Sequence, residues 1–192
     1  MEKDQVCGLI LAAGQGRRAG FAKLWRYIGE YAMLEHVAQR VFNSDLEKVL
    51  MVTGFERSFA EKIAEKYGFT SCYNENYLKG MSTSLKKGVE SLPEDCKAIV
   101  IILGDMPYIK SSTINILVSA FECGKKDIII PVYKNKRGHP IVISTIYKEK
   151  ILAIQGDKGA RDIIDNNLWN VQFIDVDDEG ILIDIDKFDD KE

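Results

Sequence analysis

The sequence predicts an α/β fold, in which a doubly wound, mostly parallel sheet carries helices on both faces. Four short apolar runs, rich in Ile and Val, lie at residues 6–12, 49–53, 98–103 and 128–132. Uninterrupted runs of this kind are typical of strands that are buried on both faces, as they are in a parallel sheet. Helical patterns occupy segments between these runs, and this order of strand and helix also favours parallel pairing.

Two of the predicted helices each show an apolar stripe with i, i+3, i+4 spacing, which suits packing on a sheet. The stripes consist of Leu34, Val37, Ala38, Val41 and Phe42, and of Ile114, Leu117, Val118 and Phe121. A third helix is predicted to begin near Met81, with Ser82 or Ser84 as a cap at its N-terminus. Pro93 limits the far end of this helix.

The end of the chain changes character after Val171. Apolar residues alternate with polar ones on both sides of an acidic turn at residues 177–180, which predicts a hairpin-like ending. The charged residues 186–192 are expected to fray.

Length and charge limit the class of protein. A chain of 192 residues is long enough to bury one α/β core and short for two, so residues 1–192 are expected to form a single domain. The 26 basic and 29 acidic residues give a formal charge of −3. This balance gives no reason to expect nucleic acid or an anionic membrane as a partner. A small-molecule partner is expected instead.

The cysteines and the first residues indicate the compartment. Cys7, Cys72, Cys96 and Cys123 form no CxxC pair, which argues against a zinc knuckle or a disulfide framework. The first five residues lack the basic and apolar regions of a signal peptide, and the longest apolar run is too short to span a bilayer. These features predict a soluble, cytoplasmic protein.

The segment at residues 11–23 follows the first apolar run and combines small residues with positive charge. Its glycines are Gly14, Gly16 and Gly20, and its cations are Arg17, Arg18 and Lys23. Glycines let backbone N–H groups approach an anion closely, and the cations can neutralise phosphate charge. A second segment, residues 104–107, follows another buried run, and both segments are expected at the carboxyl edge of the sheet, facing one crevice.

Two kinds of phosphate loop compete for this segment. Residues 14–19 satisfy the dinucleotide-binding pattern G-x-G-x-x-A, so a nicotinamide or flavin enzyme is considered. That pattern needs an acidic residue at the end of the second strand, whereas the candidate Glu35 lies inside a helical pattern and the strand ends at Thr53. A Walker P-loop is excluded because no Gly-Lys-Ser/Thr triplet follows at the required spacing.

Nucleotidyl transfer accounts better for the charges. Arg18 and Lys23 would bind a triphosphate and stabilise the departing pyrophosphate. Magnesium needs only one or two protein carboxylates, and Asp105, at the end of a buried run, is the expected first ligand. A turn or helix-cap role for Asp105 before Ser111 remains the alternative.

Residues 11–23 resemble the signature loop of the MobA-like nucleotidyltransferases, L-A-[AG]-G-x-S-x-R-M-G-x-x-K, although Gly16 and Ala19 replace its serine and methionine. Further motifs, in family order, resemble the molybdenum cofactor cytidylyltransferase branch. These motifs lie at residues 80–85, 104–107, 137–140, 156–161 and 184–186. The resemblance covers nearly the whole chain and implies a Rossmann-like nucleotidyltransferase fold.

The resemblance implies an Mg²⁺-dependent enzyme that transfers CMP from CTP to the terminal phosphate of molybdopterin. Its partners would be CTP, the molybdopterin cofactor and a molybdenum hydroxylase apoenzyme. The implied catalytic residues are Arg18, Lys23 and Asp105. The implied nucleotide-binding residues are Leu11, Ala12, Ala13, Gly14, Arg18, Lys23, Gly80, Ser82, Ser84, Gly104 and Asp105. The implied acceptor-binding residues are Arg137, His139, Asp157 and Arg161.

Three points stay open in this interpretation. The metal ligands would be Asp105 and Asp184, with Asp186 as the alternative to Asp184. The choice of nucleotide base rests on the pair Ala12-Ala13, which resembles cytosine-using more than guanine-using members of the family. The acceptor could instead be a sugar or polyol phosphate, and a non-catalytic carrier or insertion chaperone of the molybdenum cofactor is a rival of another class.

Overall fold

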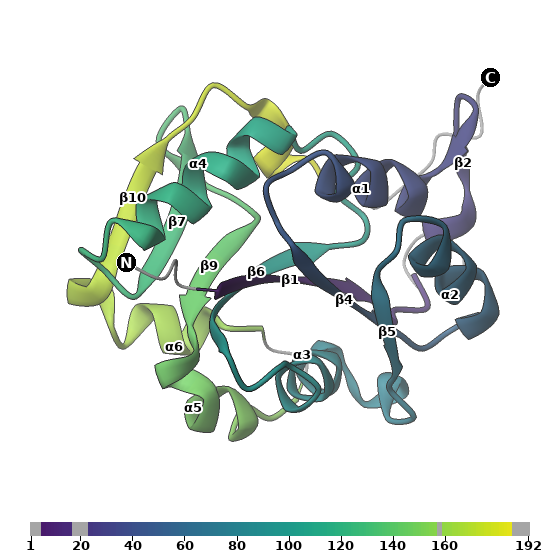
Figure 1. Cartoon of the computed structure of the whole chain (residues 1–192), viewed down its shortest axis with the longest axis horizontal. Coiled ribbons are helices and arrows are strands. Elements are labelled where there is room, and N and C mark those ends of the chain that lie inside the picture. Colours follow the sequence, from purple (N-terminus) through teal and green to yellow (C-terminus); the bar gives the residue numbers. More distant parts are fainter. Residues whose placement is uncertain (1–4, 17–22, 157–158, 186–192) are drawn as a thin grey trace.

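A computed structural model describes residues 5–16, 23–156 and 159–185 of the chain. Its centre is an eight-stranded sheet in the order β10-β7-β9-β6-β1-β4-β5, with β8 paired to β7 (Figure 1). Four neighbouring strands pair in parallel: β1 (Gln5–Ala12), β4 (Lys48–Thr53), β5 (Thr70–Tyr73) and β6 (Cys96–Leu103). The other strands of this sheet are β7 (Ile128–Tyr133), β8 (Lys136–Arg137), β9 (Ile141–Ser144) and β10 (Val171–Asp175). A separate small hairpin pairs β2 (Tyr27–Ile28) with β3 (Tyr31–Ala32).

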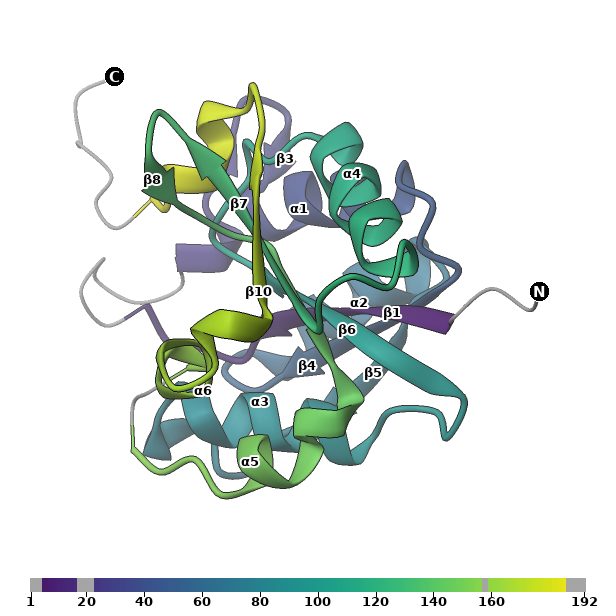
Figure 2. The ribbon, with the colours of Figure 1, turned by 90° about the vertical axis from the view of Figure 1, so that its left-hand side faces the viewer.

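Helices cover both faces of this sheet (Figures 1 and 2). One face carries α1 (Met33–Phe42), α2 (Arg57–Lys66) and α4 (Ser111–Glu122). The other face carries α3 (Met81–Glu90), α5 (Lys148–Leu152) and α6 (Arg161–Asp165). Short 3₁₀ turns are η2 (Lys23–Trp25), η3 (Tyr77–Lys79), η4 (Thr145–Tyr147), η5 (Leu168–Asn170) and η6 (Glu179–Leu182). The expected mixed but mostly parallel α/β sheet is therefore confirmed.

The four predicted buried strands correspond to β1, β4, β6 and β7. Alternate side chains of β1 enter the two cores: Ile10 packs on the α1 and α4 side, and Leu9 packs on the α3 side. Both side chains have no exposed surface. Burial on two faces is the physical reason why these strands show continuous apolar runs.

The connections of β1 create a topological switch point. The chain runs from β1 through α1 to β4 and through α2 to β5, with both helices on one face. It then crosses by α3 on the opposite face to β6, which pairs with the other side of β1. In doubly wound sheets a crevice for ligands opens at such a point, at the carboxyl ends of the strands.

The predicted hairpin-like ending is wrong. β10 pairs parallel with β7, and residues 179–182 form the 3₁₀ turn η6 instead of a returning strand. Asp178 is 2% exposed and holds this turn, since its carboxylate accepts hydrogen bonds from the N–H groups of Gly180 and Lys110 and from the Thr113 hydroxyl. Asp178 therefore joins the turn to the start of α4, and the expectation that residues 186–192 fray lies outside the described residues.

The predicted N-terminus of α3 is confirmed, but its predicted serine cap is wrong. The helix begins at Met81 and ends at Glu90, before Pro93. Its N-cap is Gly80, and no side chain makes a capping hydrogen bond there. In the described ranges, no helix has the length and apolar character needed to cross a membrane.

Candidate active site

Lys23 and Asp105 meet at the carboxyl edge of the sheet. Lys23 is the first residue of η2, after the loop that leaves β1, and Asp105 follows the end of β6. The Lys23 ammonium donates to Oδ2 of Asp105 over 3.0 Å, although Lys23 itself is only 5% exposed. A lysine is rarely so buried unless its charge is paired, so this ion pair makes the position possible.

Two glycines allow the chain to bring these residues together. Gly16 has φ +62°, and a Cβ placed on it would lie 2.6 Å from Cβ of Lys23. Gly104 donates from its N–H to the carbonyl of Leu11 over 3.1 Å, and a Cβ there would lie 3.0 Å from the same oxygen. The end of β1 and the turn after β6 are therefore held close together, and Lys23 contacts that turn through Asp105.

Asp105 keeps one oxygen unused among the described residues. Its Oδ1 is buried and has no hydrogen-bond partner in this part of the chain. The carbonyl of Asp105 accepts the N–H of Ile185 over 3.2 Å, which brings the exposed Asp184 into the same neighbourhood. No cluster of three or more His, Cys, Asp or Glu suited to a metal occurs among the described residues. Two carboxylates with one vacant oxygen still fit a hard cation that completes its shell with phosphates and water.

His139 lies close enough to Asp105 for the charge of this carboxylate to act on the imidazole. The backbone N–H of His139 donates to the carbonyl of Ile181 over 3.0 Å. The ring nitrogen Nδ1 is buried without a hydrogen-bond partner among the described residues. Burial lowers the pKa of His139, and the carbonyl of Ile101 and the charge of Asp105 oppose that shift only in part. A histidine with a lowered pKa is neutral near pH 7, so it adds a hydrogen-bonding group to the site without adding charge.

Arg137 is arranged differently from His139. Its guanidinium lies 4.6 Å from the centre of the Phe173 ring and 3.8 Å from the carboxylate of Asp165, and half of its side chain is exposed. Arg137 thus stands between β10 and the end of α6, and the contacts that it makes do not join it to Asp105.

The start of α3 carries three of the predicted nucleotide-binding residues. Gly80 has φ 109°, a value that favours glycine, and Ser82 and Ser84 are both buried. The Ser82 hydroxyl donates to the carbonyl of Gly156, and the Ser84 hydroxyl accepts from Asn74 over 3.0 Å. Both predicted nucleotide-binding serines therefore make contacts within the protein in this structure.

The remaining predicted residues divide into three groups. Ala12 and Ala13 are buried and Leu11 is half-buried at the end of β1, while Gly14 is exposed with no atom within 4 Å of its Cβ position. Arg161 is exposed at the start of α6. Arg18, Asp157 and Asp186 lie outside the described residues.

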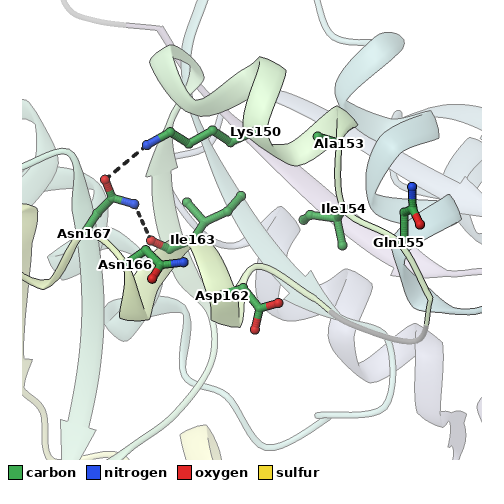
Figure 3. Close-up of a pocket in the computed structure, with 8 residues that line it drawn as sticks. All are labelled: Lys150, Ala153, Ile154, Gln155, Asp162, Ile163, Asn166 and Asn167. Carbon is green, nitrogen blue, oxygen red and sulfur yellow. Dashed lines mark hydrogen bonds between the residues drawn. The ribbon is translucent and has the colours of Figure 1, made fainter.

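A pocket of about 530 Å³ lies between α5 and α6 (Figure 3). It is lined by Lys150, Ala153, Ile154, Gln155, Asp162, Ile163, Asn166 and Asn167. Within it, Asn167 accepts from Lys150 over 3.2 Å and donates to the carbonyl of Ile163 over 2.6 Å (Figure 3). Of the predicted site residues that the structure describes, none lines this pocket.

Asn74 is a buried polar residue beside the start of α3 that the sequence analysis did not single out. It follows β5, is 2% exposed, and contacts the start of α3 through two side-chain hydrogen bonds. Its position directly after a strand that pairs with β4 is a signal that it lies at the carboxyl edge. That strand has only four residues and is partly exposed, so its apolar run was too weak to predict.

Sequence comparisons relate the chain to nucleotidyltransferases and to one oxidoreductase. The nicotine blue oxidoreductase of Paenarthrobacter nicotinovorans is 27% identical over 191 residues, which cover 94% of this chain and 92% of that protein. A probable molybdenum cofactor guanylyltransferase of Thermococcus sibiricus is 26% identical over 137 residues, or 71% of this chain and 66% of that protein. The bifunctional protein GlmU of a Wolbachia species is 29% identical over 158 residues, which cover 79% of this chain but only 38% of GlmU.

Solved structures share the fold. The crystal structure of Rv0371c from Mycobacterium tuberculosis superposes with a TM-score of 0.87 at 22% identity, covering 98% of this chain and 96% of that one. A nucleotidyl transferase from Methanothermobacter gives a TM-score of 0.80 at 16% identity, covering 97% and 94%. Rv0371c has also been solved in complex with manganese, with a TM-score of 0.76 at 20% identity and coverage of 90% and 88%.

The sequence profile of the MobA-like NTP transferase domain matches residues 8–171, which include the loop after β1, the turn that carries Asp105, the start of α3 and the residues around His139. This match spans most of the chain. The chain therefore belongs to the MobA-like NTP transferase domain family.

Proposed function

We propose that this protein is an Mg²⁺-dependent cytidylyltransferase that transfers CMP from CTP to the terminal phosphate of molybdopterin and releases pyrophosphate. The observation that carries the proposal is the ion pair between buried Lys23 and partly exposed Asp105, in which Oδ1 of Asp105 has no partner among the described residues. A buried cation beside a carboxylate with a vacant oxygen suits a ligand that is itself a complex of polyphosphate and metal.

In this proposal the loop after β1 binds the triphosphate. Gly14 is exposed and leaves its backbone open to an anion, while Lys23 supplies positive charge from the far end of the loop. Arg18 would add a guanidinium from within the same loop. These groups oppose the charge that builds up on the oxygens of the departing pyrophosphate, which is the main task of a phosphoryl-transfer site.

The proposed magnesium ligands are Asp105 and Asp184. Asp105 has a buried oxygen available, and the hydrogen bond from Ile185 to the Asp105 carbonyl brings the neighbouring Asp184 close. When bound, Mg²⁺ would neutralise negative charge on the phosphates. The ammonium of Lys23 meanwhile holds the other oxygen of Asp105 and fixes the orientation of the carboxylate.

The proposed acceptor site includes His139, Arg137, Arg161 and Asp157. The terminal phosphate of the acceptor is already an anionic nucleophile, so the protein need not remove a proton from it and must mainly align it. Neutral His139 has a single ring N–H, which faces the Ile101 carbonyl, so its proposed role is to shape the acceptor site without adding charge. The exposed Arg161 would supply charge at the rim.

Pyrophosphate release with CTP, Mg²⁺ and molybdopterin tests this function. CTP, GTP and ATP are compared, each with molybdopterin and with a panel of sugar and polyol phosphates. The proposal predicts release with CTP and molybdopterin and little with the other pairs. Turnover with a sugar or polyol phosphate and none with molybdopterin would replace the acceptor, and binding of the molybdenum cofactor without turnover of any nucleotide would indicate a carrier or insertion chaperone.

A second candidate function is an oxidoreductase that uses a dinucleotide. It is favoured by the relative of 94% coverage that is named nicotine blue oxidoreductase, and by the pattern G-x-G-x-x-A at residues 14–19. Titration with NADH and NADPH separates the two candidates. Tight binding of a reduced nicotinamide, together with no binding of CTP, would favour the oxidoreductase.

A further inference from the structure

Asn74 stands at the centre of a buried hydrogen-bond network between β5 and α3. Its side-chain amide donates to the hydroxyl of Thr83 over 2.9 Å and to the hydroxyl of Ser84 over 3.0 Å. Its side-chain oxygen accepts the N–H of Asn76 over 3.0 Å. Both donors and the acceptor of the amide are thus used inside the protein, which is what a residue with 2% exposure requires.

The network fixes the backbone at Gly80. The single hydrogen of the Thr83 hydroxyl is shared between the carbonyls of Gly80 and Asn76, which lie 2.9 and 3.0 Å from the oxygen. Asn74 therefore holds both ends of the short segment that contains η3 and leads to α3. Gly80 keeps φ 109° within this frame, so the backbone at the start of α3 has one defined orientation.

The same segment is connected to the loop after β1. The N–H of Asn74 donates to the carbonyl of Thr53, at the end of β4, over 2.8 Å. The N–H of Phe55 donates to the carbonyl of Ala13 over 3.1 Å. A Cβ on Gly54 would lie 2.7 Å from that carbonyl oxygen and 2.8 Å from Cβ of Tyr77. Ala13, Gly54 and η3 are therefore in close contact, and Asn74 joins this group to α3.

We infer that Asn74 is a positioning residue that sets the distance between the loop after β1 and the start of α3, and thereby selects the nucleotide base. The inference rests on the proposed function, with Ala13 and Gly80 as nucleotide-binding residues that the family resemblance implies, and we place the base between them. The network prevents the wall at Gly80 from moving, so a larger base would clash with it and a smaller base would leave a gap beside it. Without the Asn74 amide, Thr83 and Ser84 lose their common partner, and the wall can adapt to either base.

The matched control is Asn167. It is also a buried asparagine, at 4% exposure, and its side chain also accepts one hydrogen bond and donates another (Figure 3). It lies after α6, between Lys150 and Ile163, away from the loop after β1. N167A thus removes a comparable buried amide without touching the network of Asn74.

The test compares wild type, N74A and N167A by calorimetric titration with CTP and with GTP, in the presence of Mg²⁺ and without an acceptor. We expect N74A to weaken CTP binding roughly tenfold and to bring the two dissociation constants closer together, while N167A stays within about twofold of wild type for both. Unchanged affinities and unchanged discrimination in folded N74A would overturn the inference. Equal losses in N74A and N167A would also overturn it, since a general loss of stability would then explain both.

Thr83→Val covers the case in which N74A does not fold. Valine keeps the shape of threonine and removes only the hydroxyl that joins Asn74 to Gly80. T83V is expected to change the ratio of CTP to GTP affinity in the same direction, and an unchanged ratio would count against Asn74. Failure of the proposed function looks different: a wild type that binds CTP but releases no pyrophosphate with molybdopterin loses the proposed acceptor, whereas a wild type that binds no nucleotide ends both proposals.

Discussion

At the scale of single residues, the main feature is a carboxylate that is only half used. Asp105 pairs one oxygen with a lysine of 5% exposure and keeps the other buried without a described partner. An ion pair built only for stability would be expected to use both oxygens, because an unpartnered buried polar atom costs free energy. The proposal assigns this oxygen to the metal, and the next two predictions test the two members of the pair separately.

Asp105→Asn is expected to lower the rate of pyrophosphate release by about 100-fold or more, because an amide is a poor ligand for magnesium and leaves Lys23 without its counter-charge. Binding of CTP without metal should change little. Steady-state pyrophosphate assays and metal-free titrations measure the two effects. Asp95→Asn is the control, since Asp95 pairs with Lys48 over 2.5 Å beyond the opposite, amino end of the strands. An undiminished rate in D105N would show that the metal lies elsewhere.

Lys23→Met is expected to lower kcat/KM for CTP by about 100-fold, because the charge opposite the triphosphate is lost while the length of the side chain is kept. Lys48→Met is the matched control: it removes the lysine of the other Lys–Asp pair, and its kcat/KM should stay near that of wild type. The same loss in both variants would show that the effect is general and not a property of the site.

At the scale of elements, three segments pack on one another beside the candidate site: those around Gly138, Gly180 and Tyr108. A Cβ on Gly138 would lie 2.3 Å from the carbonyl oxygen of Ile181, and a Cβ on Gly180 would lie 2.2 Å from that of Tyr108. These atoms belong to backbone, which cannot move aside as the end of a side chain can. The turn before β9, the turn η6 and the segment after Asp105 are therefore fixed in close contact.

Gly138→Ala is expected to lower the free energy of unfolding by about 1–3 kcal/mol, because the added methyl group forces this backbone apart. It should also reduce turnover beyond the loss of folded protein, since His139 and the segment before Asp184 both move with it. Denaturant unfolding and an activity normalised to folded protein measure the two effects. A variant as stable and as active as wild type would contradict the account of this packing.

The elements that could be predicted from the sequence are those whose environment is local and uniform. β1, β4, β6 and β7 are buried on both faces, and α1 and α4 carry continuous stripes, so each shows its period directly. β5 and β9 have four residues each, which is too short to show a period. The pairing of β10 with β7 is set by contacts distant in sequence, and an alternating pattern cannot distinguish such a strand from one arm of a hairpin.

Only part of the candidate site could be predicted from the sequence. Lys23 and Asp105 could be expected together because each follows a buried parallel strand, and strands of this kind end at one edge. Asn74 could not be expected, since its role depends on hydroxyl groups that lie close only after α3 has packed. The contacts of Ser82 and Ser84 within the protein have the same origin.

At the scale of the whole molecule, the candidate site lies beside β1, where the chain stops adding strands on one side of β1 and adds β6 on the other. The segments after β1, β5 and β6 all reach this edge, so a ligand that touches them holds separate parts of the chain together. Such a ligand binds the native state and not the unfolded chain, and it must raise the stability of the native state.

CTP with Mg²⁺, at about 100 times its dissociation constant, is expected to raise the free energy of unfolding by about 2.7 kcal/mol. Addition of EDTA should remove much of this gain in wild type, and D105N should show little gain from Mg²⁺. Thermal unfolding at a series of CTP concentrations gives these values. An equal gain with and without the metal would contradict a shared site for nucleotide and cation.

The most direct measurement is a crystal structure with CTP and Mn²⁺, in which anomalous scattering locates the metal. The account predicts a manganese ion coordinated by Asp105, with the triphosphate between that ion and the Lys23 ammonium and the base between the loop after β1 and the start of α3. A nucleotide bound elsewhere, or a metal that Asp105 does not touch, would contradict it.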